Sequence, residues 1–371
     1  MAKEIYSVFT GTGKCIPPKM VPNSYFKDHR FYDSKGNRYV KENGEVQDGE
    51  ESADKVSQIS AIEVRRYAKE DQNTSDLAYE AAKNCLESSD TDPETLDGIT
   101  VAQNFGDISY DNRRSDIVPS LAARVKHYLK IKNPKTICYD LQFGCPGWLQ
   151  GVIQANQRIK SGDAKKILVI GAETLERVCD PHDRDITLYS AGAGAGLLEA
   201  RLSEKPVGIL SYSARSDTFK EAFMLRMETS YGPDHNGDEL YLHMDGRDLF
   251  KYAAKTVPLV VQEALEKAEI TDIKDVKKIL IHQANARLDE AIVKNLFKKY
   301  GIRLDEVPEK IMPMTISWLG NSSVATLPTL LDLIRKKELA GHELKPHDLV
   351  VFASVGAGMN INAVPYRFPK N

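Results

Sequence analysis

The segment DLQFGCPGWLQGV, residues 140–152, contains a sharp corner between two kinds of secondary structure. The apolar, β-rich run before it predicts a strand, and the residues after it have the spacing of a helix. Gly144 allows an unusual backbone conformation at the corner, and Pro146 suits the first position of a helix because it needs no partner for an N–H. Cys145 is therefore placed where unpaired N–H groups and the helix dipole favour a thiolate. A nucleophile is one interpretation, and a small buried apolar residue is the other.

Four segments share this change from an apolar strand to a turn and a helix, which indicates an α/β protein with buried strands. They are LDGITVAQNFG (96–106), KTICYDLQFGCPG (135–147), KKILVIGAET (165–174) and KKILIHQANA (277–286). The last two resemble each other, since each has paired lysines, a short apolar strand and a corner of small residues. This repeat favours a duplicated chain. We expect two halves, residues 1–203 with the cysteine and residues 204–371 with the other candidate residues.

The composition excludes several classes of protein. The chain has 371 residues, 42% of them hydrophobic, and 50 basic against 53 acidic residues give a net charge of -3, so a nucleic-acid partner is not expected. The N-terminus lacks the apolar core of a signal peptide and no window is apolar enough to cross a membrane, which predicts a cytoplasmic protein. Five scattered cysteines without a CxxC pair argue against a disulfide framework and against a zinc site, and we expect no metal.

Two segments interrupt the pattern. Residues 27–57 are densely charged and poor in apolar positions, which predicts a surface insertion, with a hairpin around residues 35–37. Residues 215–240 form a second long connection. Loops of this length inside a compact domain are often lids or interface arms.

Three further positions are candidates for chemistry. His282 ends an apolar strand at the carboxyl edge of the predicted sheet, where α/β folds collect reactive groups, although a structural histidine is the alternative. Asn321 follows a glycine and precedes a helix, so capping is its alternative role. Near the C-terminus, residues 356–358 (Gly-Ala-Gly) break an apolar strand and allow a backbone to approach a substrate closely.

Cys145 in FGCPG, His282 in HQAN, Asn321 in GNSS and the glycine-rich C-terminal strand together resemble the β-ketoacyl-acyl-carrier-protein synthase III family of the thiolase superfamily. The likeness extends over most of the chain. It includes the segments FTGTGKCIPP (9–18), RIKSGDAKKILVIGAETLERVCDPHDRD (158–185) and LHMDGRDLFKYAAK (242–255). The resemblance implies an α/β thiolase-like fold with five layers, αβαβα, built from two duplicated halves, in a homodimer.

The resemblance also implies an activity. Cys145 would attack an acyl thioester and hold the acyl group, and malonyl- or ketoacyl-acyl carrier protein would then condense with it in a decarboxylative Claisen reaction. His282 and Asn321 would stabilise the enolate oxygen, and the backbone N–H groups of Cys145 and Ala357 would stabilise the oxyanion of the acyl carbonyl. Such a reaction needs no metal or redox cofactor, only substrates linked to pantetheine.

Substrate and partner sites follow from the same resemblance. The positions that match the family's substrate tunnel are Arg184, Gly246, Phe250, Asn285 and Val355. A surface ion pair with a neighbouring aspartate is the alternative role for the arginine. Arg287 and Lys294 match the family's docking positions for an acyl carrier protein, and Lys298 falls on the same helix face, so we expect all three to contact the carrier. Such a stripe is otherwise only a solvated surface.

The chain departs from the family at several of its motifs. The RTGI motif that helps to hold coenzyme A is ISAI at 59–62, FGDGAGA is YSAGAGA at 189–195, and a phenylalanine is replaced by Val355. We therefore expect a carrier-bound or longer acyl donor, as in specialised relatives that make alkylresorcinols, quinolones or polyketides.

Rival interpretations are a thiolase, a chalcone-synthase-like enzyme and a non-catalytic thioester-binding partner. The C-terminal ASVGAGM lacks the second cysteine that a thiolase requires. AGAGAG at 191–196 lacks the ordered GxGxxG of a dinucleotide site, so close packing of a helix on a sheet explains it better.

Overall fold

Two mixed β-sheets hold the buried apolar runs in the computed structural model, which describes residues 3–370. The first sheet has the order β1 (Glu4–Cys15), β9 (Ala191–Ser203), β8 (Lys166–Thr174), β4 (Gly98–Ala102) and β7 (Ile137–Leu141). The second has the order β10 (Gly208–Ile209), β16 (Asn360–Arg367), β15 (Leu349–Gly356) and β14 (Val276–Ile281), with β11 (Ser213–Ser216) also beside β16. In both sheets, the strands named first in this order pair antiparallel, and those named last pair parallel.

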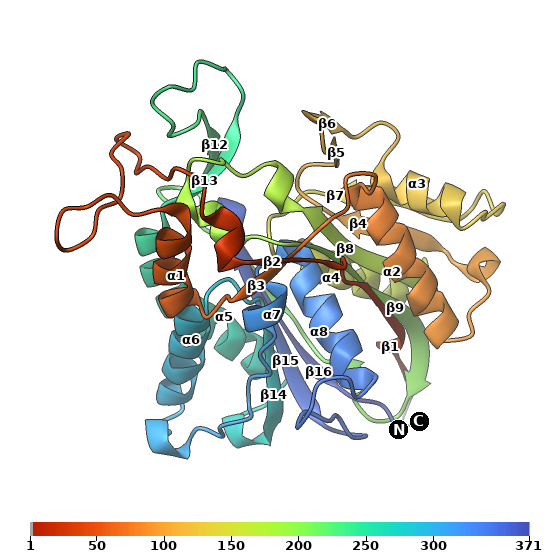
Figure 1. The fold of residues 1–371 in the computed structure, drawn as a ribbon. Coiled ribbons are helices and arrows are strands. Elements are labelled where there is room, and N and C mark those ends of the chain that lie inside the picture. The colour runs from red at the N-terminus through yellow and green to blue at the C-terminus, as the bar shows by residue number, and fades with distance from the viewer. Residues whose placement is uncertain (1–2, 371) are drawn as a thin grey trace.

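Helices cover both sheets and separate them from each other (Figure 1). The outer face of the first sheet carries α2 (Thr74–Ser88) and α3 (Leu121–Tyr128). Between the sheets lie α4 (Gly147–Lys160) and α8 (Thr326–Arg335), and the outer face of the second sheet carries α5 (Gly246–Lys267) and α6 (Ala286–Lys299). The predicted five-layer α/β fold is therefore confirmed. The predicted boundary at 203/204 falls between β9 and β10 and remains a prediction.

An aromatic cluster joins the two sheets through the middle layer. The ring of Phe9 from β1 stacks on Trp148 from α4 with ring centres 5.7 Å apart. The centre of the Phe352 ring, from β15, lies 6.1 Å from that of Trp148, and Tyr366 from β16 lies 5.2 Å from Phe9. All four side chains are buried, so this cluster fixes one sheet against the other.

The remaining elements lie around the two sheets. They are β2 (Lys19–Pro22), α1 (Gly49–Ser60), β3 (Val64–Tyr67), β5 (Asp107–Ser109), β6 (Asn112–Asp116), β12 (Leu225–Glu228), β13 (Tyr241–Met244) and α7 (Ile316–Leu319). The second predicted loop is thus partly ordered, since β12 pairs with β13. Within residues 3–370, no helix is both long and apolar enough to cross a bilayer.

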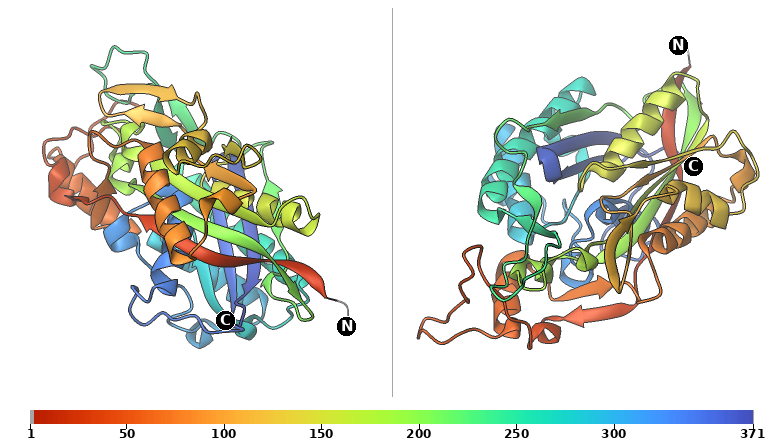
Figure 2. Two further views of the ribbon diagram at one scale, coloured as in Figure 1. Left: turned by 90° about the vertical axis from the view of Figure 1, so that its right-hand side faces the viewer. Right: turned by 90° about the horizontal axis from the view of Figure 1, so that it is seen from above.

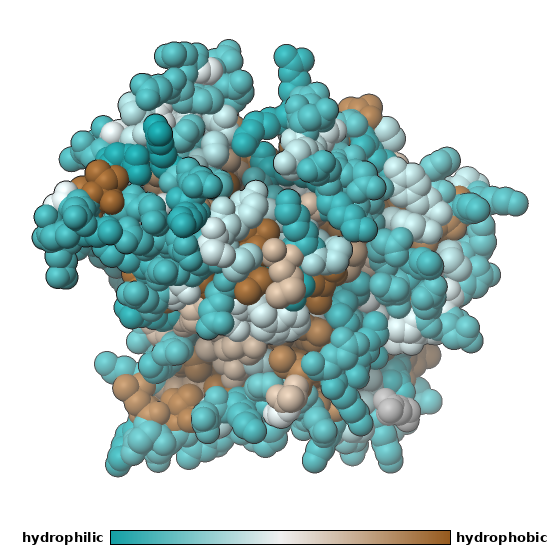
Figure 3. All heavy atoms as spheres, viewed as in Figure 1, coloured by the Kyte–Doolittle hydropathy of each residue, from teal (hydrophilic) through white to brown (hydrophobic). Residues whose placement is uncertain are grey.

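The charged insertion is only partly the surface loop that its composition predicts. Its first part projects from the body of the molecule with two isolated bridges, Tyr32 to Arg38 and Val40 to Val46 (Figures 1 and 2). Its last part belongs to α1, whose first turn is closed by a capping box between Asp48 and Glu51. That cap explains a helix in a sequence poor in apolar residues. The face that carries this region is mainly hydrophilic, with apolar side chains gathered near its centre (Figure 3).

Small residues in β9 allow α8 to pack directly on the first sheet. A Cβ atom at Gly194 would lie 2.6 Å from the backbone nitrogen of Thr329 in α8. A Cβ at Gly192, on the same strand, would meet nothing closer than 3.5 Å. The AGAGAG run thus serves helix-to-sheet packing.

We expect Gly194→Ala to lower the free energy of unfolding by about 2–3 kcal/mol, because the new methyl group has no space in a close-packed interface. Gly192→Ala is the matched control and should change it by less than about 1 kcal/mol. Urea denaturation of both variants tests this; equal stability of the two would contradict the packing argument.

Candidate active site

The Cys145 corner lies directly against the C-terminal end of β15. Gly144 has a φ of +66°, and a Cβ there would lie 2.7 Å from the nitrogen of Ala357. A Cβ at Gly356 would lie 2.5 Å from the nitrogen of Cys145. Only glycine fits at both positions, because the two backbones touch. The predicted oxyanion donors, the N–H groups of Cys145 and Ala357, therefore lie where these two backbones touch.

His282 and Asn321 lie on two other loops near this backbone contact. His282 follows β14, is 3% exposed, and its backbone N–H donates to the carbonyl oxygen of Ala353 over 2.9 Å. Asn321 follows α7 and is 5% exposed, and its Oδ1 accepts from the backbone N–H of Ser323 over 2.9 Å. The Oγ of Ser323 lies 3.3 Å from the Sγ of Cys145. Ser323 thus contacts Cys145 and Asn321 through hydrogen bonds, and its backbone lies close enough to His282 to raise the pKa of the imidazole against the effect of burial.

Burial determines the protonation states of His282 and Cys145. It lowers the pKa of His282 to about 4, partly opposed by the backbone of Ser323, so the imidazole is neutral at pH 7. Burial also raises the pKa of Cys145 to about 11, and the nearby Glu173 carboxyl adds to the rise. The Ser323 hydroxyl and the cysteine's own N–H act in the opposite direction. The thiolate therefore depends on these two donors.

Three polar side chains near the sulfur are not among the residues that the sequence predicts for the site. Glu173, 2% exposed in β8, accepts a hydrogen bond from the Nδ2 of Asn104 at the end of β4. Burial raises the pKa of Glu173 to about 8. The same Nδ2 lies 3.4 Å from the Oγ of Ser323. The sequence does contain a signal for two of them. Asn104 and Glu173 lie at the carboxyl ends of buried apolar runs, where α/β proteins place polar groups.

A cavity of about 490 Å³ beside α5 and α6 borders this site at Asn321, while Cys145 and His282 are not among its lining residues. Its walls include four of the predicted tunnel residues and one of the predicted catalytic residues, namely Arg184, Gly246, Phe250, Asn285 and Asn321. The Oδ1 of Asn285 also caps α6 by accepting from the N–H of Leu288. Val355 lies instead in the apolar cluster between β15 and α5, so the structure does not place it on this wall.

Arg184 has an aromatic partner at the mouth of the cavity. Its guanidinium carbon lies 4.1 Å from the centre of the Tyr39 ring, within cation–π distance. Tyr39 belongs to the charged insertion and is half-buried. The insertion therefore supplies a side chain to the region that the sequence assigns to the substrate.

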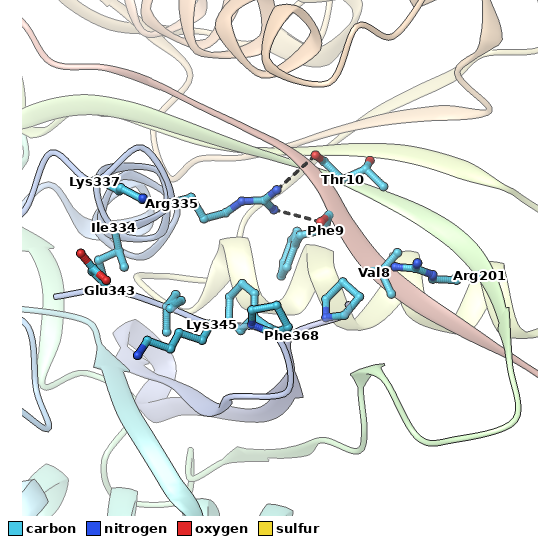
Figure 4. Close-up of a pocket in the computed structure, with 13 residues that line it drawn as sticks. Val8, Phe9, Thr10, Arg201, Ile334, Arg335, Lys337, Glu343, Lys345 and Phe368 are labelled. Atoms are coloured by element: carbon cyan, nitrogen blue, oxygen red, sulfur yellow. Dashed lines mark hydrogen bonds between the residues drawn. The ribbon is translucent and has the colours of Figure 1, made fainter. Parts of the chain in front are cut away.

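A second cavity, of about 560 Å³, lies between β1 and the end of α8 (Figure 4). The guanidinium of Arg335 there donates to the carbonyl oxygens of Phe9 over 2.9 Å and Thr10 over 3.2 Å (Figure 4). Its walls contain none of the three candidate catalytic residues, whereas the walls of the first cavity include Asn321. The first cavity is thus the better candidate for the reaction.

The three predicted docking residues all lie exposed on α6, the helix whose first turn borders the first cavity through Leu288. Arg287 donates to the carbonyl oxygen of Gln58 in α1 over 3.1 Å, and Lys294 pairs with Glu290 at 3.1 Å. Lys298 follows one turn later on the same helix. In residues 3–370, no three histidine, cysteine or acidic side chains are grouped to hold a metal ion.

Comparison with known proteins gives consistent matches along the chain. Residues 139–218 match the family described as 3-oxoacyl-[acyl-carrier-protein (ACP)] synthase III, and residues 253–368 match its C-terminal family. A β-ketoacyl-[acyl-carrier-protein] synthase III from Dinoroseobacter shibae is 31% identical over 98% of this chain and 99% of its own.

Two solved structures illustrate the likeness of fold. The 3-oxoacyl-[acyl-carrier-protein] synthase III of Aquifex aeolicus VF5 is 28% identical with a TM-score of 0.76, over 98% of this chain and 100% of its own. The priming β-ketosynthase of the R1128 polyketide pathway has a TM-score of 0.77 at 22% identity, over 100% and 98%, which shows the fold alone.

The buried Glu173 carboxyl should make stability depend on pH. Its folded pKa of about 8 lies above the ordinary value of 4.5, so between these pH values the unfolded chain loses a proton that the folded chain keeps. This contribution destabilises the fold increasingly as pH rises towards 8. We expect Glu173→Gln to gain stability over the natural protein between pH 5 and pH 8, by about 2–4 kcal/mol. Thermal unfolding at both pH values measures it, with the exposed Glu70→Gln as control; parallel curves for the Glu173 variant would refute it.

Proposed function

Because the chain belongs to the 3-oxoacyl-[acyl-carrier-protein] synthase III family and is a condensing acyltransferase, we propose that Cys145, His282 and Asn321 perform its two half-reactions. The observation that supports this assignment is their common position around Ser323, behind a cavity that reaches Asn321. The proposal gives each residue a different task.

In the first half-reaction, the sulfur of Cys145 attacks the carbonyl carbon of an acyl thioester. The bond from carbon to the pantetheine sulfur breaks, and that sulfur leaves as a thiol with the proton that Cys145 loses. The negative charge on the carbonyl oxygen develops beside the N–H groups of Cys145 and Ala357. Their contact across Gly144 and Gly356 favours one fixed oxyanion hole.

In the second half-reaction, a malonyl thioester on an acyl carrier protein loses carbon dioxide. The resulting enolate carbon attacks the acyl carbon, and Cys145 leaves as a thiolate. Charge on the enolate oxygen requires donors in a dry site. A neutral His282 can donate without carrying a proton that would quench the enolate, and its pKa of about 4 supports this role. The Oδ1 of Asn321 is bound by Ser323, which leaves its amide N–H groups for the enolate.

The cavity suits the pantetheine arm of both thioesters. Apolar side chains, among them Leu188, Leu249 and Phe250, line it together with the polar Asn285 and Arg184. An elongated, largely uncharged arm with amide groups matches such a lining. The chemistry proceeds on the thioesters themselves, so we assign the enzyme no metal or redox cofactor.

The acyl donor is proposed to be bound to a carrier protein, or longer than acetyl, rather than the acetyl-coenzyme A of fatty-acid initiation. One face of Arg184 is covered by Tyr39, and an adenine ring cannot occupy that face while the pair is in place. The ISAI segment brings Ile59 to the cavity in place of the usual coenzyme A motif. A condensing enzyme of specialised metabolism, of alkylresorcinol, quinolone or polyketide type, is the second candidate, and the same departures favour it.

The carrier protein is proposed to dock on α6. Arg287, Lys294 and Lys298 lie exposed on this helix, whose first turn borders the cavity through Leu288, and carrier proteins are acidic. We also propose a cytoplasmic homodimer. The edge strand β7 carries the half-exposed Ile137, and an exposed edge strand is a natural place for sheet-to-sheet pairing.

Substitution of the three residues should separate the half-reactions. We expect Cys145→Ala to form no acyl-enzyme and to reduce the rate at least ~10³-fold. Asn321→Ala should still be acylated but should condense ~10²–10³-fold more slowly, because only the second step loses a donor. Mass spectrometry of the acyl-enzyme and product assays measure the two steps, with Cys138→Ala as control. A Cys145→Ala variant with unchanged turnover, or a natural protein that never acylates, would favour a binding protein instead.

The choice of donor should depend on Tyr39. We expect Cys145 to be acylated faster from acyl-carrier thioesters than from acetyl-coenzyme A. Tyr39→Ala should raise the coenzyme A rate roughly 2–5-fold, the range of an exposed cation–π contact, without changing the carrier rate. Tyr32→Ala, an aromatic of the same insertion that lies near Arg38, is the matched control. Rapid acetyl transfer from coenzyme A to the natural enzyme would count against a carrier-bound donor.

A further inference from the structure

We propose that the Ser323 hydroxyl is a catalytic hydrogen-bond donor to the sulfur of Cys145, held in that role by Asn104 and Glu173 as positioning residues. The proposal rests on the proposed function of Cys145 as the nucleophile. It adds a fourth side chain to that site and assigns it a part in both half-reactions.

The directions of the hydrogen bonds leave the hydroxyl proton of Ser323 for the sulfur. The Oγ of Ser323 lies 3.3 Å from the Sγ of Cys145, and the Nδ2 of Asn104 lies 3.4 Å from the same Oγ. An amide N–H can only donate, so the serine oxygen accepts from Asn104 and its own proton is left for the sulfur. Glu173 accepts a hydrogen bond from the same Nδ2, so the amide nitrogen of Asn104 faces both the carboxyl and the serine.

The backbone of Ser323 has an unusual conformation that its neighbours hold in place. Its φ is +51°, in the left-handed region that residues other than glycine rarely adopt, and it is 2% exposed. Such a conformation persists only where its surroundings hold it, and it is common at functional sites. Two contacts hold it here. Its N–H is bound to Asn321, and the next residue, Val324, packs on Gly171 of β8, where a Cβ would lie 2.3 Å from its carbonyl oxygen.

Among residues 3–370, the sulfur of Cys145 has no neighbouring cation to stabilise its thiolate. The ionisable groups close to Cys145 are His282, neutral at pH 7, the Glu173 carboxyl and the phenol of Tyr189, and none of these is a cation. The groups that lower the pKa of Cys145 against its burial are the Ser323 hydroxyl and the cysteine's own N–H. The hydroxyl is therefore the one side-chain donor that the described residues offer to the thiolate.

The role in the reaction follows from the charge on sulfur. Ser323 keeps its proton throughout and only shares it. It stabilises the thiolate that attacks the first thioester. The sulfur of the acyl-enzyme is a poor acceptor, so the contact weakens once the acyl group is bound. When the condensation expels the thiolate again, the hydroxyl stabilises the leaving group. His282 and Asn321, by contrast, serve the enolate.

The test is the pH dependence of Cys145 alkylation by iodoacetamide, followed by mass spectrometry of the Cys145 peptide in the full-length protein. Ser323→Gly removes the hydroxyl while glycine suits the φ of +51°. We expect the alkylation midpoint to rise by about one pH unit, and the rate at pH 8 to fall about tenfold, since one unit of pKa is a tenfold change in thiolate. Ser323→Ala should behave in the same way. Ser322→Ala is the matched control, because its hydroxyl pairs with Thr326 over 3.3 Å, and it should match the natural protein.

An alkylation profile of Ser323→Gly and Ser323→Ala equal to that of the natural protein would overturn the proposal. If neither variant folds, Asn104→Ala decides instead. It should shift the midpoint in the same direction by a smaller amount, about threefold in rate, and an unchanged profile would again overturn the proposal. Alkylation needs no substrate. Failure of the serine proposal is therefore distinguishable from failure of the proposed condensation, which the acylation and product assays report separately.

Discussion

The direct contact of two backbones, at the Cys145 corner and at the end of β15, is the constraint on which the rest of the site depends. Gly144 and Gly356 each lack the Cβ that would force the chains apart. Because they touch, the nucleophile from the first sheet and the N–H of Ala357 from the second sheet are fixed relative to each other without any side chain between them. A catalytic group positioned by backbone contact has few ways to move, which is what preorganised stabilisation of an oxyanion requires.

Around this contact, burial makes the chemistry possible and also difficult. It keeps His282 neutral, but it also opposes ionisation of Cys145 and of Glu173. The chain compensates with oriented dipoles rather than with charges, since Ser323 and Asn104 supply N–H and O–H groups in one direction. A cation at this place would stabilise the thiolate more strongly but would also hold it back from attack. A neutral hydrogen-bond donor stabilises the thiolate less than a cation and therefore lowers its nucleophilicity less.

The sequence was sufficient for the family, the five-layer fold and the loops that carry Cys145, His282 and Asn321, because strand-to-helix corners and glycines have clear local signatures. It was not sufficient for Glu173, Asn104 and Ser323. Each of these is an ordinary polar residue locally, and its role arises only from neighbours 69 to 219 residues away in the chain. The helix at the end of the insertion was hidden for a different reason. Asp48 and Glu51 stabilise it through a capping box, so it forms without the apolar periodicity that predicts most helices.

The aromatic cluster in the middle layer has a consequence for how the molecule comes apart. Phe9 and Trp148 belong with the first sheet, and Phe352 and Tyr366 belong to the second, yet each pair is buried largely by the other. Melting of one sheet would expose the inner apolar surface of its neighbour to water. Neither sheet has an independent core on that side, so partial denaturation offers no stable stopping point. We therefore expect the two sheets to unfold together as one cooperative unit.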